Sequence, residues 1–182
     1  MYLSIRYGSI NLESGGQVVD VIEAVAHPSY SDWTLDNDIA LIRTKTPISL
    51  DSSTASVIAL PEQDSDVASG QSVTITGWGY TTESGQLAPI LQKISIPVVD
   101  RNVCRETYKN YNEVTNSMLC AGNPKGGVDA CQGDSGGPVV ANGILVGAVS
   151  WGYEQTCAQP DTYGVYTRIA KFRDWIKIKT LI

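Results

Sequence analysis

The stretch that most constrains the fold is residues 129–138, which read Asp-Ala-Cys-Gln-Gly-Asp-Ser-Gly-Gly-Pro. Ser135 lies in a glycine-rich turn, behind a cysteine that can tether it. Gly133 and Gly136 allow backbone conformations that other residues avoid. Such a turn can direct the amides of Gly133 and Ser135 at one point, and two converging N–H donors beside a hydroxyl make an oxyanion hole. The ten residues together therefore predict a nucleophilic serine. Asp134, buried next to that serine, is expected to need a cationic partner.

The rest of the chain predicts an all-β protein with a helix at its C-terminal end. Apolar alternation between glycine-rich turns predicts short strands, and Asn142-Gly143 between two apolar runs predicts a hairpin. An aspartate able to cap a first turn predicts a helix over 100–108, and an amphipathic pattern predicts another over 169–178. The strands are expected at 3–7, 18–26, 39–44, 72–77, 92–98, 138–141, 144–151 and 164–168.

The size and charge of the chain exclude several classes of protein. A length of 182 residues with 42% hydrophobic and 18% charged residues is typical of one globular domain. No apolar run approaches the roughly 18 residues that span a bilayer, so we expect no membrane partner. The net charge of −6 argues against nucleic acid as a partner.

The four cysteines, Cys104, Cys120, Cys131 and Cys157, favour disulfides over a metal site. Their number is even, no C-x-x-C pair occurs, and the only histidine is distant in the sequence. We expect two disulfides, for which three pairings are possible, and hence an oxidising compartment and secretion. Residues 1–20 contain no signal-peptide pattern. We therefore expect that the true N-terminus and its signal peptide are missing from this chain.

Motifs along almost the whole chain resemble those of the chymotrypsin-like serine proteases, and of the trypsin subgroup in particular. They include D-N-D-I-A-L at 36–41, T-G-W-G at 76–79, C-A-G at 120–122, the G-D-S-G-G-P core, V-S-W-G at 149–152, G-V-Y-T-R at 164–168 and D-W-I at 174–176. The resemblance implies a double antiparallel β-barrel with a C-terminal α-helix. Residues 1–69 would form a partial first barrel, and residues 70–182 the second barrel and the helix.

The resemblance also implies the catalytic roles. Ser135 matches the nucleophile, and Asp38 matches the aspartate that orients the catalytic histidine. Gly133 and Ser135 match the oxyanion-hole amides, and Ser150 matches a serine near that aspartate. In active relatives, a freed N-terminal ammonium pairs with the aspartate that matches Asp134. The implied disulfides are Cys104–Cys120 and Cys131–Cys157.

Asp129 matches the base of the primary specificity pocket, where a carboxylate favours Lys or Arg before the scissile bond. Ala130 is expected to bias the pocket mildly toward Arg, and Thr156 to narrow its mouth. Glu154, if it leans inward, would add preference for basic substrates. Tyr163 replaces the usual proline. A tyrosine at this position accompanies a sodium-binding loop in some relatives, but we expect this loop to be structural. We expect the protein to bind neither a metal nor a cofactor. The remaining substrate-binding residues implied are Gln132, Ser150, Trp151, Gly152 and Gly164.

Two family segments are absent: L-T-A-A-H-C, which holds the catalytic histidine, and the I-V-G-G-type activation terminus. His27 lies in A-H-P-S-Y and matches a structural position. We therefore expect a trypsin-like endopeptidase by family, and we expect this chain of 182 residues to be inactive by itself. Its partners would be polypeptides with Lys or Arg before the scissile bond and protease inhibitors, and the complete protein would be a monomer. A non-catalytic homologue with a binding or regulatory role is the alternative; a sugar- or ligand-binding β protein that shares only the turn fits the motifs least.

Overall fold

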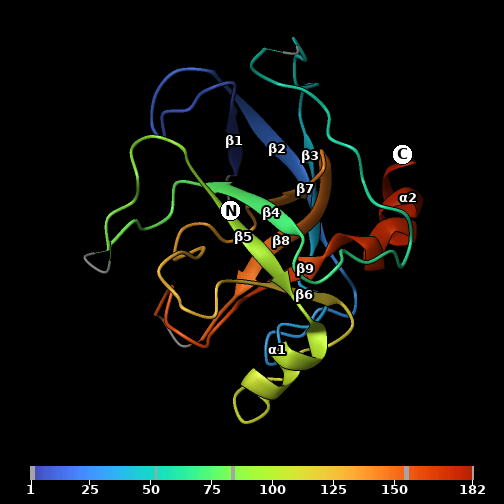
Figure 1. Cartoon of the computed structure of the whole chain (residues 1–182). Helices are drawn as coiled ribbons and strands as arrows, with labels where there is room; N and C mark the ends of the chain where they lie inside the picture. Colours follow the sequence, from blue (N-terminus) through green and yellow to red (C-terminus); the bar gives the residue numbers. More distant parts are fainter. Residues whose placement is uncertain (1–2, 52, 83–84, 154–155, 182) are drawn as a thin grey trace.

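The computed structural model describes residues 3–51, 53–82, 85–153 and 156–181, which form two antiparallel β units (Figure 1). The first is a three-stranded sheet in the order β1-β2-β3. The second is a closed barrel in the order β4-β5-β6-β9-β8-β7. The all-β prediction is therefore confirmed, with one complete barrel and an open sheet where the other would be. The strands are β1 (Ser4–Tyr7), β2 (Gln17–Ala26), β3 (Ala40–Thr44), β4 (Ser72–Gly77), β5 (Gln92–Val99), β6 (Met118–Ala121), β7 (Pro138–Ala141), β8 (Ile144–Trp151) and β9 (Gly164–Arg168).

The predicted strands all occur, to within one residue at their ends, and one strand was missed. Strand β6 pairs with both β5 and β9 and closes the barrel. All four of its residues are buried. A strand that is buried on both faces shows no alternation of apolar and polar residues, so its sequence carries no period-two signal.

The hairpin between β7 and β8 turns at Asn142 and Gly143, as predicted. Both residues have positive φ angles, 49° and 76°. Positive φ at both central residues is the conformation of a type I′ turn, and its twist matches that of the flanking strands.

Two helices accompany the barrel. Helix α1 (Arg101–Tyr108) begins at Asp100, whose carboxylate accepts hydrogen bonds from the amides of Asn102 and Val103. The C-terminal segment begins as a 3₁₀ turn, η1 (Ile169–Phe172), and continues as α2 (Arg173–Thr180). Both helices lie close to the predicted positions. In the described part of the chain, no helix is long and apolar enough to cross a membrane.

The barrel holds the main core. Its inward side chains form one cluster, and a disulfide-linked cluster lies between α1 and β6. Cys104 pairs with Cys120 and Cys131 with Cys157, which are the pairings that the resemblance implied. The main cluster consists of Val73, Ile75, Ile96, Val98, Leu119, Ala121, Val139, Ala141, Val146 and Tyr166.

The three-stranded sheet has almost no core of its own. Val19 and Pro61 are the buried apolar side chains among its described residues, 3–51 and 53–69. Large apolar side chains on its strands and flanks remain exposed. They are Leu3 (44%), Val18 (56%), Ile22 (53%) and Ile42 (50%).

One set of contacts between the sheet and the barrel side runs through the C-terminal segment. Leu41 and Ile39 pack against a cluster that contains Ile169 and Phe172. The ring of His27 lies edge-on to Phe172 and Trp175, with ring centroids 5.2 and 5.0 Å away. These contacts fix the sheet beside the barrel, so that residues after β2 can reach the barrel's edge.

Candidate active site

Ser135 lies in the turn that leads into β7. Gly133 and Gly136 have φ angles of +93° and +78°, a region that favours glycine. At Gly137 a side chain would place Cβ only 2.7 Å from the carbonyl oxygen of Asp134. Within the described ranges, the amides of Gly133 and Ser135 have no intramolecular acceptor. The turn therefore keeps two N–H donors available beside the serine.

Asp134 is bound by the backbone and not by a cation. Its carboxylate accepts hydrogen bonds from the amide of Gly79 at 2.8 Å and of Cys131 at 3.0 Å. A Cβ on Gly79 would lie 2.4 Å from the carboxyl carbon, so only a glycine permits this approach. Among the described residues no cationic side chain pairs with Asp134, and these two amides hold its carboxylate. The expected cationic partner stays a prediction.

Asp38 lies on the segment between β2 and β3, and the barrel holds it from the other side. The hydroxyl of Ser150, on β8, donates to the Asp38 carboxylate at 2.7 Å. The hydroxyl of Thr167, on β9, donates to the Asp38 carbonyl oxygen at 2.6 Å. The structure thus brings Asp38 and Ser150 together from positions 112 residues apart.

A second carboxylate on the same loop, Asp36, was not identified from the sequence. It accepts hydrogen bonds from the hydroxyls of Thr115, at 2.7 Å, and Ser117. Burial alone would raise the pKa of Asp36, but these hydrogen bonds outweigh it and lower the pKa. The bonds fix the loop that carries Asp38 against the barrel. No sequence motif joins residues 79 positions apart, so only the fold reveals this contact.

A cavity of about 830 Å³ lies behind the serine turn, with Asp129, Ala130, Gln132 and Thr156 in its wall. It extends past Asp134 toward residues of β4 and β5. It is therefore larger than a slot for one side chain. Glu154, a candidate for this region, lies outside the described residues.

The carboxylate of Asp129 is partly buried in this wall. It accepts hydrogen bonds from the amide of Ala130 at 2.8 Å and from the hydroxyl of Tyr166 at 3.3 Å. Burial raises the pKa of Asp129, and it also raises the pKa of Tyr166. The sequence analysis missed Tyr166, whose only signal was its place in G-V-Y-T-R. A Cβ at Gly164 would lie 2.3 Å from the Tyr166 hydroxyl oxygen, so glycine is needed for this arrangement.

Four of the implied substrate-binding residues are not in the cavity lining, namely Ser150, Trp151, Gly152 and Gly164. The first two end β8, Gly152 follows it, and Gly164 begins β9. A Cβ at Gly152 would meet no atom within 4 Å, so the space beside it is open. The rings of Tyr108 and Trp151 meet edge-on, and their centroids lie 4.9 Å apart.

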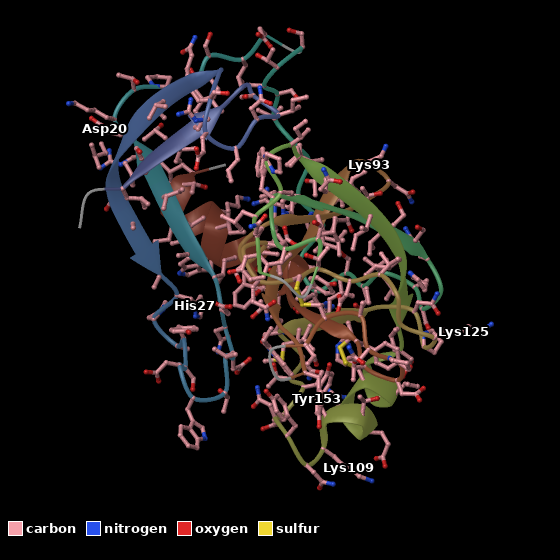
Figure 2. All side chains as sticks on the ribbon, turned by 90° about the vertical axis from the view of Figure 1, so that its left-hand side faces the viewer. Asp20, His27, Lys93, Lys109, Lys125 and Tyr153 are labelled. Carbon is pink, nitrogen blue, oxygen red and sulfur yellow. A yellow bond between two sulfur atoms is a disulfide. The ribbon has the colours of Figure 1, made fainter. Side chains whose placement is uncertain are left out.

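The remaining expectations concern His27 and bound metal. The contacts of His27 are with the C-terminal aromatic rings and with the amide of Ser29, which donates to Nδ1 at 3.2 Å. Figure 2 shows His27 at the end of β2. Over the described residues, no group of three or more His, Cys, Asp or Glu side chains could hold a metal ion.

A six-stranded antiparallel barrel beside a smaller sheet, with a glycine-rich serine turn at the entry to one strand, defines the chymotrypsin-like class of serine proteases. Comparison with known protein families identifies the subgroup. The family described as Trypsin matches residues 2–176, so the chain belongs to the trypsin family.

Individual relatives agree with this assignment. The chain is 48% identical to Trypsin Blo t 3 of Blomia tropicalis, a match that covers 97% of this chain and 67% of the relative. It is 41% identical to Trypsin 5G1 of Aedes aegypti, over 96% and 65%. It is 43% identical to the anionic trypsin of Bos taurus, over 97% and 70%. The chain thus spans about two thirds of the length of these relatives.

Proposed function

We propose that the protein is a trypsin-like endopeptidase that cleaves polypeptides after Lys or Arg. The observation that carries this proposal is the partly buried carboxylate of Asp129 in the wall of the cavity. A desolvated carboxylate is stabilised by a cationic side chain, and most strongly by the paired donors of a guanidinium. Ala130 beside it favours Arg mildly.

The catalytic roles follow the same proposal. Ser135 is the nucleophile, and the amides of Gly133 and Ser135 bind the oxyanion that forms when its oxygen attacks the scissile carbonyl. Asp38, held by Ser150, is placed to orient a general base. The base itself is a histidine in this class of enzymes.

We infer that the 182-residue chain by itself is inactive. Its one histidine, His27, packs against Phe172 and Trp175 and not against Ser135. No cationic side chain in the described ranges pairs with Asp134, the residue whose partner orders the site in active relatives. Without the base, only about 10³–10⁴-fold acceleration over water would remain.

The decisive assay uses Arg and Lys anilide substrates together with benzamidine, a small cation that fits beside a carboxylate. We expect no turnover of either substrate. By calorimetry, we expect the wild type to bind benzamidine and the Asp129→Asn variant not to bind it. Turnover that disappears in Ser135→Ala would overturn the inactivity of this chain. Benzamidine binding that is unchanged in Asp129→Asn would overturn the proposed specificity.

The second candidate function is a non-catalytic homologue with a binding or regulatory role. The packing of the chain's one histidine, His27, against Phe172 and Trp175 favours it. The presence of Ser135, Asp38 and Asp129 favours the endopeptidase. A transcript that encodes an in-frame A-A-H-C segment upstream of Met1 would decide for the endopeptidase. An upstream stop codon in a verified transcript would decide for the homologue.

The proposal extends to organisation and location. We propose one peptidase domain, with residues 1–69 as part of a first barrel and 70–182 as the second barrel and helix, that is monomeric when complete. The two disulfides, Cys104–Cys120 and Cys131–Cys157, support secretion, because such bonds persist in oxidising compartments.

A further inference from the structure

Lysine and arginine side chains mark the peptide bonds at which an endopeptidase that prefers cations could cut this chain itself. All 13 lie in the described ranges, and most belong to strands or helices. A bond within such an element becomes accessible only after the segment has left its own backbone hydrogen bonds. Three lysines lie between elements, namely Lys45, Lys109 and Lys125. These three are the candidates for cleavage of the folded chain.

Lys45 and Lys109 are each held by the structure that precedes them. Lys45 directly follows β3, and its amide donates to the carbonyl oxygen of Asp20 at 2.8 Å. Lys109 directly follows Tyr108, which is 0% exposed and whose hydroxyl donates to the carbonyl oxygen of Tyr163. Fitting either bond into a protease would require β3 to leave the sheet or a buried ring to leave the core.

Lys125 lies in the loop between β6 and β7, in which no side chain from 123 to 128 is buried. Val128, the largest apolar residue of this stretch, is 44% exposed. Figure 2 shows the Lys125 side chain projecting from the surface of the molecule. Exposed loops of small and polar residues are the preferred sites of proteolytic cutting.

Hydrogen bonds to Asn123, Ala158 and Asp161 hold this loop in place. The amides of residues 125 and 126 donate to Asn123, at 3.0 and 2.8 Å. The amide of Gly127 donates to the Ala158 carbonyl oxygen at 2.8 Å. The Asp161 amide donates to the Pro124 carbonyl oxygen at 2.9 Å. Breaking these bonds brings polar groups into water and no buried apolar side chain, so opening should cost less here than at the other two lysines.

We propose that the Lys125–Gly126 bond is a processing site, at which an endopeptidase that cleaves after Lys switches off the cation-binding pocket. In this step the oxygen of a water molecule bonds to the carbonyl carbon of Lys125, and the carbon–nitrogen bond to Gly126 breaks. The leaving nitrogen takes a proton from the water, which gives a carboxyl group on Lys125 and a new amine on Gly126. The position of the cut is independent of the proposed function, whereas its effect on the pocket rests on it.

The two disulfides lie on opposite sides of this bond, so neither spans the cut. Cys104–Cys120 precedes it and Cys131–Cys157 follows it. The fragments 1–125 and 126–182 would be held together without a covalent link, by the pairing of β4 with β7 and of β6 with β9. A cut at Lys109 would instead fall inside the loop that Cys104–Cys120 closes and would leave one covalent molecule.

The cut also lies next to the wall of the cavity. Gly127, Val128 and Asp129 are consecutive lining residues. After hydrolysis they would follow a free chain end, so the backbone would no longer fix the Asp129 carboxylate from both sides. A site that must be ordered again on binding loses affinity. Processing at Lys125 is therefore expected to weaken the binding of cations in the pocket.

The test digests the full chain with a limiting amount of bovine trypsin and follows the products by mass spectrometry without reduction. We expect the first products to be 1–125 and 126–182, as two separate masses. Lys125→Gln should slow the loss of intact chain about tenfold, because cutting follows the population of the open loop. Lys109→Gln is the matched control, since it removes a lysine that also lies between elements, and it should leave the rate unchanged.

A second measurement addresses the pocket. The nicked protein is isolated after the trypsin has been inactivated covalently and removed, and its benzamidine binding is compared with that of the intact chain by calorimetry. We expect the dissociation constant to rise about tenfold, because the wall has lost its fixed backbone.

The outcomes separate the two parts of the inference from each other and from the proposed function. A first cut at Lys45 or Lys109, or equal rates for the wild type and Lys125→Gln, would overturn the processing site. Unchanged benzamidine affinity of the nicked protein would overturn the switch. If the intact chain fails to bind benzamidine, the proposed role of Asp129 and the switch are overturned together, and the fragment masses still decide the processing site.

Discussion

The closed barrel and the three-stranded sheet are built from similar strands, yet they bury very different amounts of apolar surface. In the barrel each strand has two neighbours, and its inward side chains meet in a common core. In the sheet, β1 and β3 each have one neighbour, and Ile22 and Ile42 remain about half exposed. Strand pattern alone therefore does not stabilise a sheet; a closed or covered face does.

The comparison predicts its largest effect in amide hydrogen exchange. Amides of β6, a barrel strand whose four residues are all buried, should open only with global unfolding, whereas those of β1 should open locally. We expect protection factors about a thousandfold higher in β6, a difference of about 4 kcal/mol in opening free energy. Equal protection, measured by mass spectrometry, would show that the sheet and the barrel unfold as one unit.

Matched truncations sharpen the same comparison. Ile96→Ala removes a side chain that is 3% exposed in the barrel and should lower the free energy of unfolding by about 2–5 kcal/mol. Ile42→Ala removes one that is 50% exposed in the sheet and should cost less than about 0.5 kcal/mol. Urea unfolding followed by circular dichroism measures both. Similar losses would mean that the sheet's apolar face is covered in solution.

The disulfides are confined to the barrel side. Removing Cys131–Cys157 with a double alanine variant should cost about 2–4 kcal/mol, because the bond closes a loop of 26 residues. Benzamidine binding should weaken too, since both cysteines line the cavity. Thermal unfolding measures the loss, and the Cys104–Cys120 double alanine variant is the control that leaves the cavity wall tethered.

Asp129 should be a site where function opposes stability. Its folded pKa is raised, so the ionised form is less favourable in the fold than in the unfolded chain. Asp129→Asn should therefore raise the free energy of unfolding at pH 7. We expect this gain to be smaller than the loss caused by removing a disulfide. The gain should vanish as the pH falls below the ordinary aspartate pKa of about 3.9. A gain that persists at pH 3 would point to packing instead of charge.

The smallest effect is expected at Asp36, which joins the two regions. Its pKa is lowered, so its contribution is present above the ordinary aspartate pKa and is lost as the pH falls through the folded value. Asp36→Asn should cost less than about 1 kcal/mol at pH 7, because the group is partly exposed to solvent. Unfolding measured between pH 2 and 7 should show this loss shrinking toward acid. A constant loss would contradict an ionic origin.

Much of the fold could be predicted because its signals are local. The Asn142-Gly143 turn and the Asp100 cap depend on residues within four positions of each other, and apolar runs between turn residues marked the strands other than β6. Strand β6 is buried at all four residues and carries no period-two signal. Strand β9 is equally buried but was still predicted, so burial alone does not explain the miss. The two backbone amides that hold the Asp134 carboxylate were not predicted, because a burial argument does not say which donors satisfy a carboxylate.

By itself, the sequence determined the serine turn and the family and supplied the candidate catalytic residues, because these depend on residue type and short spacing. Only the tertiary structure decided which distant groups meet. It joined Asp38 to Ser150 across 112 positions and Asp134 to Gly79 across 55. It also joined the loop after α1 to the β2–β3 loop through the hydrogen bond from the Asn112 side chain to the Thr34 carbonyl oxygen. Such contacts depend on how the sheet packs against the barrel, and no local pattern encodes that packing.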